Sequence, residues 1–201
     1  LTQDEMAGTI DLIMQGVCAE DDIRAFLLAL VSKGETIAEI AGAAAAMRKH
    51  MTILESSRDD LVDTCGTGGD GSGTFNISTA AALVAAGSGI AVAKHGNCSI
   101  TSKTGSADVL SELGVNIEAS VDVMQQSLDE AGICFCFAPL FHPAMRHVGP
   151  ARRSIAVPTI FNLLGPLCNP ARAPYQLLGV GKAALRTRLS AALALLETKH
   201  A

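Results

Sequence analysis

A glycine-rich segment at positions 66–71 constrains the fold of this chain more than any other part of its sequence. Glycine occupies positions 66, 68, 69 and 71, directly after the predicted strand 61–65. A backbone with so few side chains can adopt positive φ and can approach a ligand closely. Ser78 and Thr79 follow, and because both residue types are good N-caps, we expect an α-helix to begin there and continue through the alanine-rich run 80–86. The segment therefore predicts a strand, a glycine loop and a helix in succession.

This arrangement favours binding of an anion. The N-terminus of a helix presents unpaired N–H groups and a partial positive charge, both of which suit phosphate or pyrophosphate. A flexible turn is the alternative, and it would be the better interpretation of an isolated glycine cluster. The hydroxyl residues and Asp70 that accompany the glycines favour a site for a phosphorylated substrate.

The common nucleotide-binding motifs fit this segment poorly. A Walker loop requires a lysine after its last glycine, and none follows here. The spacing of Gly66, Gly68 and Gly71 does match the dinucleotide fingerprint. That fingerprint opens directly into a helix and is followed about 20 residues later by an acidic residue. Further loop residues intervene here, and positions 85–90 contain no acid, so a dinucleotide site is the weaker interpretation.

A second polar loop follows the apolar run 89–93, which is long enough for a buried strand. It begins with Lys94, His95, Gly96 and Asn97, continues through several hydroxyl residues, and leads into a predicted helix at 107–113. Because ligands of open α/β sheets bind beyond the carboxyl ends of the strands, we expect both loops to meet at one site. There Lys94 supplies charge to phosphate oxygens. His95 and Asn97 could orient an organic substrate, although a lone histidine is more often structural. The loop also contains Lys103, which could be a solvated surface charge.

The order and spacing of these motifs resemble the anthranilate phosphoribosyltransferases of tryptophan biosynthesis, within the nucleoside phosphorylase and phosphoribosyltransferase fold family. The resemblance covers nearly the whole chain and rests on residues 63–71, 75–79, 94–97, 105–110, 137–139, 142–145, 152, 159–167, 169–170 and 175–180. It implies transfer of the phosphoribosyl group of 5-phosphoribosyl 1-diphosphate (PRPP) to the amine of anthranilate, giving N-(5-phosphoribosyl)anthranilate and pyrophosphate. It also implies a Mg²⁺ cofactor and a homodimer formed through the helical domain.

The resemblance assigns site residues in two groups, with no protein nucleophile. The PRPP group comprises Gly66, Gly69, Asp70, Thr74, Asn76, Ile77, Ser78, Thr79, Lys94, His95, Gly96, Asn97, Cys98, Ser99, Ile100, Thr101, Ser102 and Ser106. The anthranilate group comprises Gly66, His95, Asn97 and Arg152, with Arg152 paired to the carboxylate. Ser78 is the expected magnesium ligand.

Three departures from the family pattern accompany this resemblance. Cys98 and Pro158 stand where many members carry arginine, and the loss of a guanidinium at position 98 would weaken anion binding. The acidic Asp-Glu pair that binds metal in the family is expected beyond Ala201. Cys98 and the missing acidic pair favour one alternative, a non-catalytic relative that binds nucleic acid or a protein partner. A second alternative is a pyrimidine nucleoside phosphorylase, which shares the architecture but has a different phosphate-loop signature.

The expected fold is an α/β architecture in two parts. Residues 1–60 form a small helical domain, with helices at 4–14, 21–32 and 36–51 and a capping box formed by Thr36 and Glu39. Residues 61–201 form the PRPP-binding domain, whose mostly parallel sheet contains strands at 61–65, 89–93, 132–138 and 175–180. The resemblance joins part of 141–172 to the helical domain. A helix at 182–197 should lead into another parallel strand, so we expect the chain to be incomplete at its C-terminus.

Composition agrees with a cytoplasmic enzyme. The net charge of −5 and the pI of about 5.5 argue against nucleic acid or an anionic membrane as the main partner. The six cysteines include no Cys-x-x-Cys pair, and we interpret all of them as reduced thiols. No signal peptide is visible, because acidic residues interrupt the N-terminal segment.

Overall fold

The N-terminal part of the protein is a bundle of three helices in a computed structural model that describes residues 1–68, 71, 73–99 and 104–201. These helices are α1 (Gln3–Gln15), α2 (Glu20–Lys33) and α3 (Ile37–Lys49). The predicted capping box is present: the Thr36 hydroxyl accepts from the Glu39 N–H, and the Glu39 carboxylate accepts from the Thr36 N–H. Apolar side chains at helical spacing, such as Met6, Ile10 and Met14 of α1, face the core.

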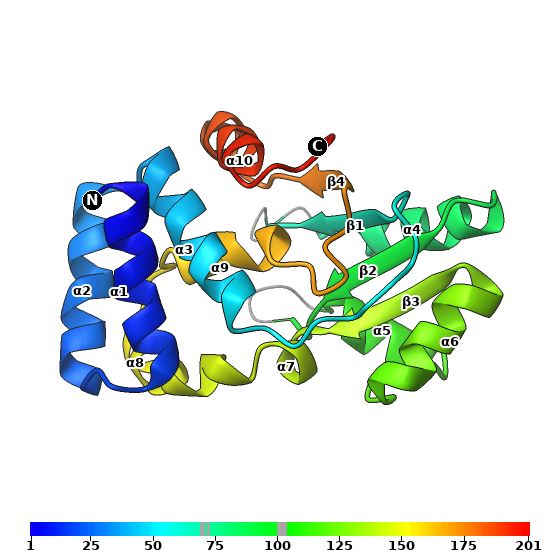
Figure 1. The fold of residues 1–201 in the computed structure, drawn as a ribbon, viewed down its shortest axis with the longest axis horizontal. Helices are drawn as coiled ribbons and strands as arrows, with labels where there is room; N and C mark the ends of the chain where they lie inside the picture. The colour runs from blue at the N-terminus through cyan, green and yellow to red at the C-terminus, as the bar shows by residue number, and fades with distance from the viewer. Residues whose placement is uncertain (69–70, 72, 100–103) are drawn as a thin grey trace.

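A later part of the chain returns to this bundle. It contains the 3₁₀ helices η1 (Pro143–His147) and η2 (Gly165–Leu167) and the short helices α8 (Gly149–Ser154) and α9 (Phe161–Leu164). Val148, Ile160 and Leu164 are fully buried in the same hydrophobic core as α1, α2 and α3. Helix α8 contacts α2, η1 contacts α1 and α9 contacts α3, and Figure 1 shows α9 between α3 and the sheet.

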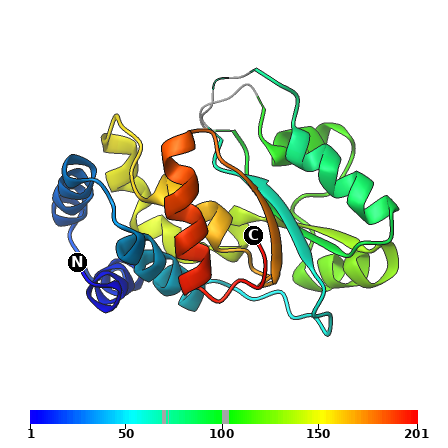
Figure 2. The same ribbon diagram turned by 90° about the horizontal axis from the view of Figure 1, so that it is seen from above.

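The described residues also form a parallel four-stranded sheet in the order β3-β2-β1-β4. Its strands are β1 (Val62–Gly66), β2 (Val92–Gly96), β3 (Ile133–Phe137) and β4 (Tyr175–Gly179). The intervening helices are α4 (Ile77–Gly87), α5 (Ser106–Glu112), α6 (Val121–Ala131) and α7 (Ala138–Phe141), and α10 (Ala183–Leu195) follows β4. Helix α10 packs on α3, and Figure 2 shows it on the opposite side of the sheet from α4. No described helix is long and apolar enough to cross a membrane.

Two local predictions from the sequence are wrong. The second strand lies at 92–96 rather than 89–93, because Gly89 adopts φ +88° and the Ile90 N–H still bonds to the Ala85 carbonyl at the end of α4. The turn therefore uses the first residues of the apolar run. Helix α4 begins at Ile77 with Asn76 as its N-cap residue, so Ser78 and Thr79 lie in its first turn and are not caps.

Hydrogen bonds tie together the segments that connect the bundle to the sheet. The Thr52 N–H donates to the Phe141 carbonyl at 2.8 Å, and the Leu54 N–H donates to the Pro170 carbonyl at 3.2 Å. The buried amide of Asn169 donates to the Ala93 carbonyl of β2 at 2.8 Å. The connecting segments are therefore hydrogen-bonded to one another and to β2, the strand that carries Lys94 and His95.

Candidate active site

A pocket lies at the carboxyl ends of β1, β2 and β3, and residues of η1, α8, α9 and η2 line its other side. Its volume is about 680 Å³. Its walls include predicted site residues from both polar loops, namely Gly66, Asn76, Ser78, Lys94, His95, Gly96, Asn97, Cys98, Ser99 and Ser106. Arg152 reaches the same pocket from α8. The glycine loop and the second polar loop therefore meet at one site, as the sequence predicts.

Lys94 lies between the ends of β1 and β2. These strands are paired at Val62 and Val92. Toward their carboxyl ends, hydrogen bonds from side chains of one strand to the backbone of the other connect them. The Asp63 carboxylate accepts from the His95 N–H at 3.1 Å, and the Lys94 ammonium donates to the Thr64 carbonyl at 2.5 Å. The Lys94 ammonium also lies 3.5 Å from the Ser78 hydroxyl, at the first turn of α4. Burial lowers the pKa of Lys94, whereas Asp63 acts to raise it.

The first loop has the backbone freedom that its glycines suggested. Gly68 and Gly71 adopt φ of +63° and +64°, a region that other residues rarely occupy. Open space surrounds the position of a Cβ atom at Gly68. The Thr67 N–H donates to the Gly179 carbonyl of β4 at 2.9 Å, so the start of the loop is anchored to the sheet.

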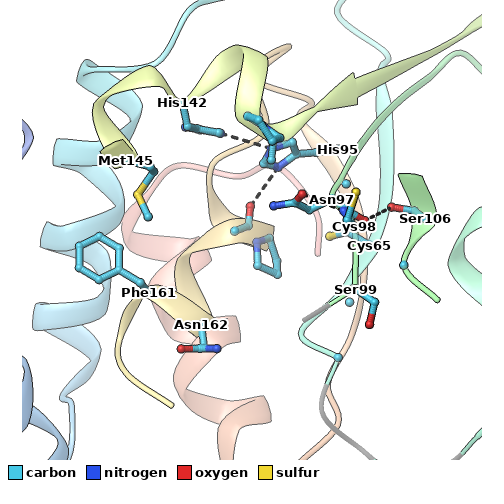
Figure 3. A pocket seen from close by; sticks show the side chains of 18 of the residues that line it. Cys65, His95, Asn97, Cys98, Ser99, Ser106, His142, Met145, Phe161 and Asn162 are labelled. Atoms are coloured by element: carbon cyan, nitrogen blue, oxygen red, sulfur yellow. Dashed lines mark hydrogen bonds between the residues drawn. The ribbon is translucent and has the colours of Figure 1, made fainter. Parts of the chain in front are cut away.

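The second loop is organised by Asp108 of α5. Its carboxylate accepts from the Gly105 N–H at 2.6 Å and from the Ser99 N–H at 2.9 Å. These backbone hydrogen bonds lower the pKa of Asp108, because they stabilise the carboxylate. A Cβ atom at position 105 would lie 2.5 Å from the Asn97 carbonyl oxygen, so this close approach requires glycine. The Ser106 hydroxyl donates to the same carbonyl at 3.4 Å, as Figure 3 shows.

A pair of buried histidines occupies another part of the wall. The Nε2 atoms of His95 and His142 lie 3.3 Å apart, and His95 Nδ1 lies 3.1 Å from the Gly165 carbonyl oxygen (Figure 3). Burial, followed by repulsion from His142, lowers the pKa of His95 to about 3. Burial also lowers the pKa of His142 to about 4, against the opposing effect of the Cys168 carbonyl. Both rings are therefore neutral near pH 7.

Arg152 lines the pocket together with the apolar side chains of Met47, Met145 and Phe161. Its guanidinium carbon is 5.6 Å from the centre of the Phe161 ring, a cation–π distance. No carboxylate among the described residues pairs with it, and burial lowers its pKa. A partly buried cation next to an apolar surface suits the carboxylate of a flat aromatic acid.

The charged side chains on the described pocket wall are all cationic. Lys94, Arg146 and Arg152 line the pocket, and no aspartate or glutamate is among the described lining residues. This contrasts with the net charge of −5 for the chain. The pocket therefore favours anionic ligands, with Lys94 near the glycine loop and Arg152 near Phe161.

The remaining predicted site residues fall into three groups: exposed residues, one buried residue, and residues outside the described part of the chain. Thr74 and Ile77 are exposed, and neither lines this pocket. Thr79 is buried, and its hydroxyl donates to Asn76 Oδ1 at 2.9 Å, so it supports the start of α4 from behind. Gly69, Asp70, Ile100, Thr101 and Ser102 lie outside the described residues.

Sequence reasoning missed lining residues that follow the third strand. His142, Met145 and Arg146 come shortly after β3, and Phe161 and Asn162 lie on α9. The rule that placed the first two loops at the carboxyl ends of their strands would also have found His142. Nothing in the sequence around Phe161 signals that α9 returns to face the sheet.

Ser78 fits a magnesium ion only as a single neutral ligand. Ser78 lines the pocket, and its hydroxyl supplies the oxygen ligand that Mg²⁺ prefers. The described residues contain no group of three or more histidine, cysteine, aspartate or glutamate side chains that could hold a metal ion. A metal at Ser78 would therefore depend on oxygen atoms of a bound ligand.

Comparison with known proteins matches the whole length of the chain. The family model described as "Glycosyl transferase family, a/b domain" matches residues 58–201, and that described as "Glycosyl transferase family, helical bundle domain" matches residues 1–51. The anthranilate phosphoribosyltransferase of Rhodopirellula baltica is 56% identical over 200 residues, which cover 100% of this chain and 58% of that protein. The corresponding protein of Chloroflexus aurantiacus is 57% identical over 201 residues, covering 100% of this chain and 59% of that protein.

Solved structures give the same result. The anthranilate phosphoribosyltransferase of Thermus thermophilus superposes with a TM-score of 0.93 at 45% identity, covering 98% of this chain and 60% of that one. The Saccharomyces cerevisiae enzyme in complex with PRPP and Mg superposes with a TM-score of 0.90 at 31% identity, covering 99% and 59%. The resemblance and the expected fold class are confirmed. The chain spans less than two thirds of the length of these relatives.

Proposed function

Because this chain belongs to the glycosyl transferase family, whose helical bundle and a/b domains it carries, we propose that its protein is an anthranilate phosphoribosyltransferase. The proposed reaction joins the amine of anthranilate to C1′ of the phosphoribosyl group of PRPP. It releases pyrophosphate and forms N-(5-phosphoribosyl)anthranilate. We further propose that the protein acts in the cytoplasm as the second enzyme of tryptophan biosynthesis from chorismate.

One observation supports this proposal: the charged side chains on the described pocket wall are cationic, and Lys94 and Arg152 lie in different parts of the pocket. Lys94 lies beside the glycine loop and the first turn of α4, which together suit phosphate groups. Arg152 lies over Phe161, which suits an aromatic acid. A phosphorylated sugar and an aromatic carboxylate could therefore occupy the two places side by side.

The residues present suit a reaction that depends on orientation and charge. Negative charge grows on the departing pyrophosphate as its bond to C1′ breaks, and the Lys94 ammonium and the N-terminus of α4 stabilise that charge. Arg152 holds the carboxylate so that the neighbouring amine faces C1′. Magnesium, held by Ser78 together with phosphate oxygens, would neutralise further negative charge.

Turnover of both substrates tests the proposal. We expect the protein, as its gene encodes it, to consume anthranilate in a PRPP-dependent and magnesium-dependent reaction, followed by the loss of anthranilate fluorescence. Benzoate, which lacks the amine, serves as a matched compound that should bind but form no product. Failure to consume anthranilate while binding of both ligands persists would contradict the proposed function and favour a non-catalytic relative.

We also propose the division into a helical domain, residues 1–60 with part of 141–172, and an α/β domain, residues 61–201. The proposed homodimer forms through the helical domain. Leu12, Val17 and Leu28, in or next to α1 and α2, support this proposal, because their side chains are 50%, 67% and 44% exposed. Light scattering would test it: we expect the wild type to be a dimer and the Val17→Glu variant to be a monomer.

A further inference from the structure

A carboxylate and an amide side chain lie next to the pocket without lining it. Asp63 of β1 is fully buried, and Gln176 of β4 is directly opposite it in the register of the sheet. Side chains of such a cross-strand pair lie on the same face of a sheet. Neither residue is among the described lining residues of the pocket. A buried carboxylate destabilises a fold unless hydrogen bonds compensate for its lost hydration, so the partners of Asp63 indicate why it is there.

Hydrogen bonds connect this pair to two different walls of the pocket. Asp63 Oδ1 accepts from the His95 N–H of β2 at 3.1 Å, and Asp63 Oδ2 accepts from Gln176 Nε2 at 3.2 Å. Gln176 Nε2 also donates to the Pro166 carbonyl of η2 at 2.6 Å. His95 and Pro166 both line the pocket. An unbroken series of hydrogen bonds therefore joins β2 to η2 through two side chains that lie outside the pocket lining.

The amide of Gln176 shows which of its atoms matter. Its nitrogen bonds to Asp63 and Pro166 and lies 3.2 Å from the Cys65 sulfur. Its oxygen, Oε1, is buried and has no hydrogen-bond partner among the described residues. An unpaired buried oxygen lowers the stability of a protein. The contribution of Gln176 therefore lies in the bonds that its nitrogen donates.

The surroundings of Asp63 favour its role as an acceptor. Burial raises the pKa of Asp63 above its usual value. The opposing effects come from Asn169, the His95 N–H, Lys94 and Gln176. Both oxygens of the carboxylate accept from N–H groups, which is the arrangement expected for an ionised side chain.

From this geometry we infer that Asp63 and Gln176 are positioning residues for the proposed reaction. They fix the distance between β2, which carries His95, and η2, which carries Pro166. The reaction requires the amine and C1′ to be held in line, and a small displacement of one wall of the site lowers the rate strongly. This inference rests on the proposed function, because it assigns a role within that reaction.

A Gln176→Met variant tests the role of Gln176, because it keeps the length of the side chain and removes the donor. At saturating PRPP and anthranilate, we expect the rate constant of a single turnover to fall by about 10-fold to 100-fold. The Kd of PRPP should change by less than about threefold, since Lys94 and the glycine loop remain. A purely structural role would lower the melting temperature but leave the rate constant of the folded protein unchanged.

Ser127→Ala is the matched control for this variant. It removes a hydrogen bond from α6 to the Ile133 carbonyl of β3, away from this pocket, and should leave the single-turnover rate constant unchanged. A rate constant of folded Gln176→Met within about threefold of the wild type would overturn the inference.

An Asp63→Asn variant tests the same connection from its other end. It keeps an oxygen that accepts from the His95 N–H but places an NH₂ group against Gln176 Nε2. We expect the same fall in the single-turnover rate constant. Because residues of one hydrogen-bond network act together, the double variant with Gln176→Met should be within about threefold of the slower single variant. Two effects that multiply would overturn the link between Asp63 and Gln176.

A measurement on the wild-type protein does not depend on folding of the variants. In hydrogen-exchange NMR, we expect the side-chain amide protons of Gln176 to exchange at least about 100-fold more slowly than those of Gln126, which is exposed on α6. Equal exchange would contradict the inference even if the enzyme is active. Absence of any turnover by the wild type would instead contradict the proposed function.

Discussion

Arg152 shows how a single side chain can be held ready for a ligand. It is half-buried, lies over Phe161 and has no carboxylate partner among the described residues. A guanidinium in this state has already lost part of its hydration, so a bound carboxylate gains a charge-assisted hydrogen bond at a smaller desolvation cost.

We expect Arg152→Ala to weaken anthranilate binding by about 10-fold to 150-fold, which corresponds to a loss of about 1.5–3 kcal/mol. PRPP binding should change little, because Lys94 and the glycine loop remain. Titration calorimetry of each ligand would measure both effects. Arg153→Ala, which removes the neighbouring exposed arginine, is the control, and equal effects of the two variants would contradict the role of Arg152.

Gly68 allows a second comparison between matched residues. Gly68 and Gly34 both have positive φ, at +63° and +80°, and both have open space where a Cβ atom would lie. We expect Gly68→Ala to raise the KM for PRPP more than that for anthranilate, because the strained loop would move away from the phosphate groups. Gly34→Ala introduces similar strain at the end of α2 and should leave both KM values unchanged. Steady-state kinetics with each substrate varied in turn would distinguish these outcomes.

Among the elements, α3 is joined to the rest of the bundle through a buried carboxylate. Glu39 is fully buried, and its carboxylate accepts from the Thr36 N–H at 2.9 Å and from the Lys33 ammonium at 2.7 Å. Burial raises the pKa of Glu39, but hydrogen bonds from Lys33, the N-terminus and Thr36 outweigh it and lower the pKa to about 2. The ionised carboxylate is therefore part of the cap of α3.

This low pKa predicts a dependence of stability on pH. Glu39 stabilises the fold above its usual pKa of 4.5, and this contribution is lost as the pH falls toward 2. We expect Glu39→Gln to be less stable than the wild type at pH 7 and to lose less stability on acidification. Urea denaturation between pH 7 and pH 3 would measure both slopes. Glu5→Gln, which changes the exposed capping box of α1, is the control.

The elements that can be predicted from the sequence are those with a local signal, such as apolar spacing or a helix cap. The helices α1, α2 and α3 and the strands β1, β3 and β4 were predicted to within about three residues, because apolar spacing and caps identify them. The start of β2 was wrong, since the turn at Gly89 looks apolar in the sequence. Helix α6 was not predicted although Ser120 caps it. The pocket residues of α9 depend on a tertiary contact that no local pattern encodes.

At the scale of the whole molecule, Asn169 links the connecting segments to the sheet. Its side-chain amide donates to the Ala93 carbonyl, and its side-chain oxygen accepts from the Ala171 N–H, both at 2.8 Å. We expect Asn169→Ala to lower the free energy of unfolding by about 2 kcal/mol or more, because it leaves both buried backbone groups without a partner. Asn116→Ala, at an exposed turn, should cost much less. Urea denaturation would compare the two, and equal losses would contradict the linking role.

The repeated passage of the chain between the bundle and the sheet has a consequence for how such proteins can be recombined. The apolar face of the three N-terminal helices is covered by residues 148–168 and by α10, which come after the first three strands. A gene fusion that transferred residues 1–51 alone would therefore leave their apolar face without the segments that cover it. Exchange of the bundle between relatives would have to replace these distant segments together, because they complete its hydrophobic core.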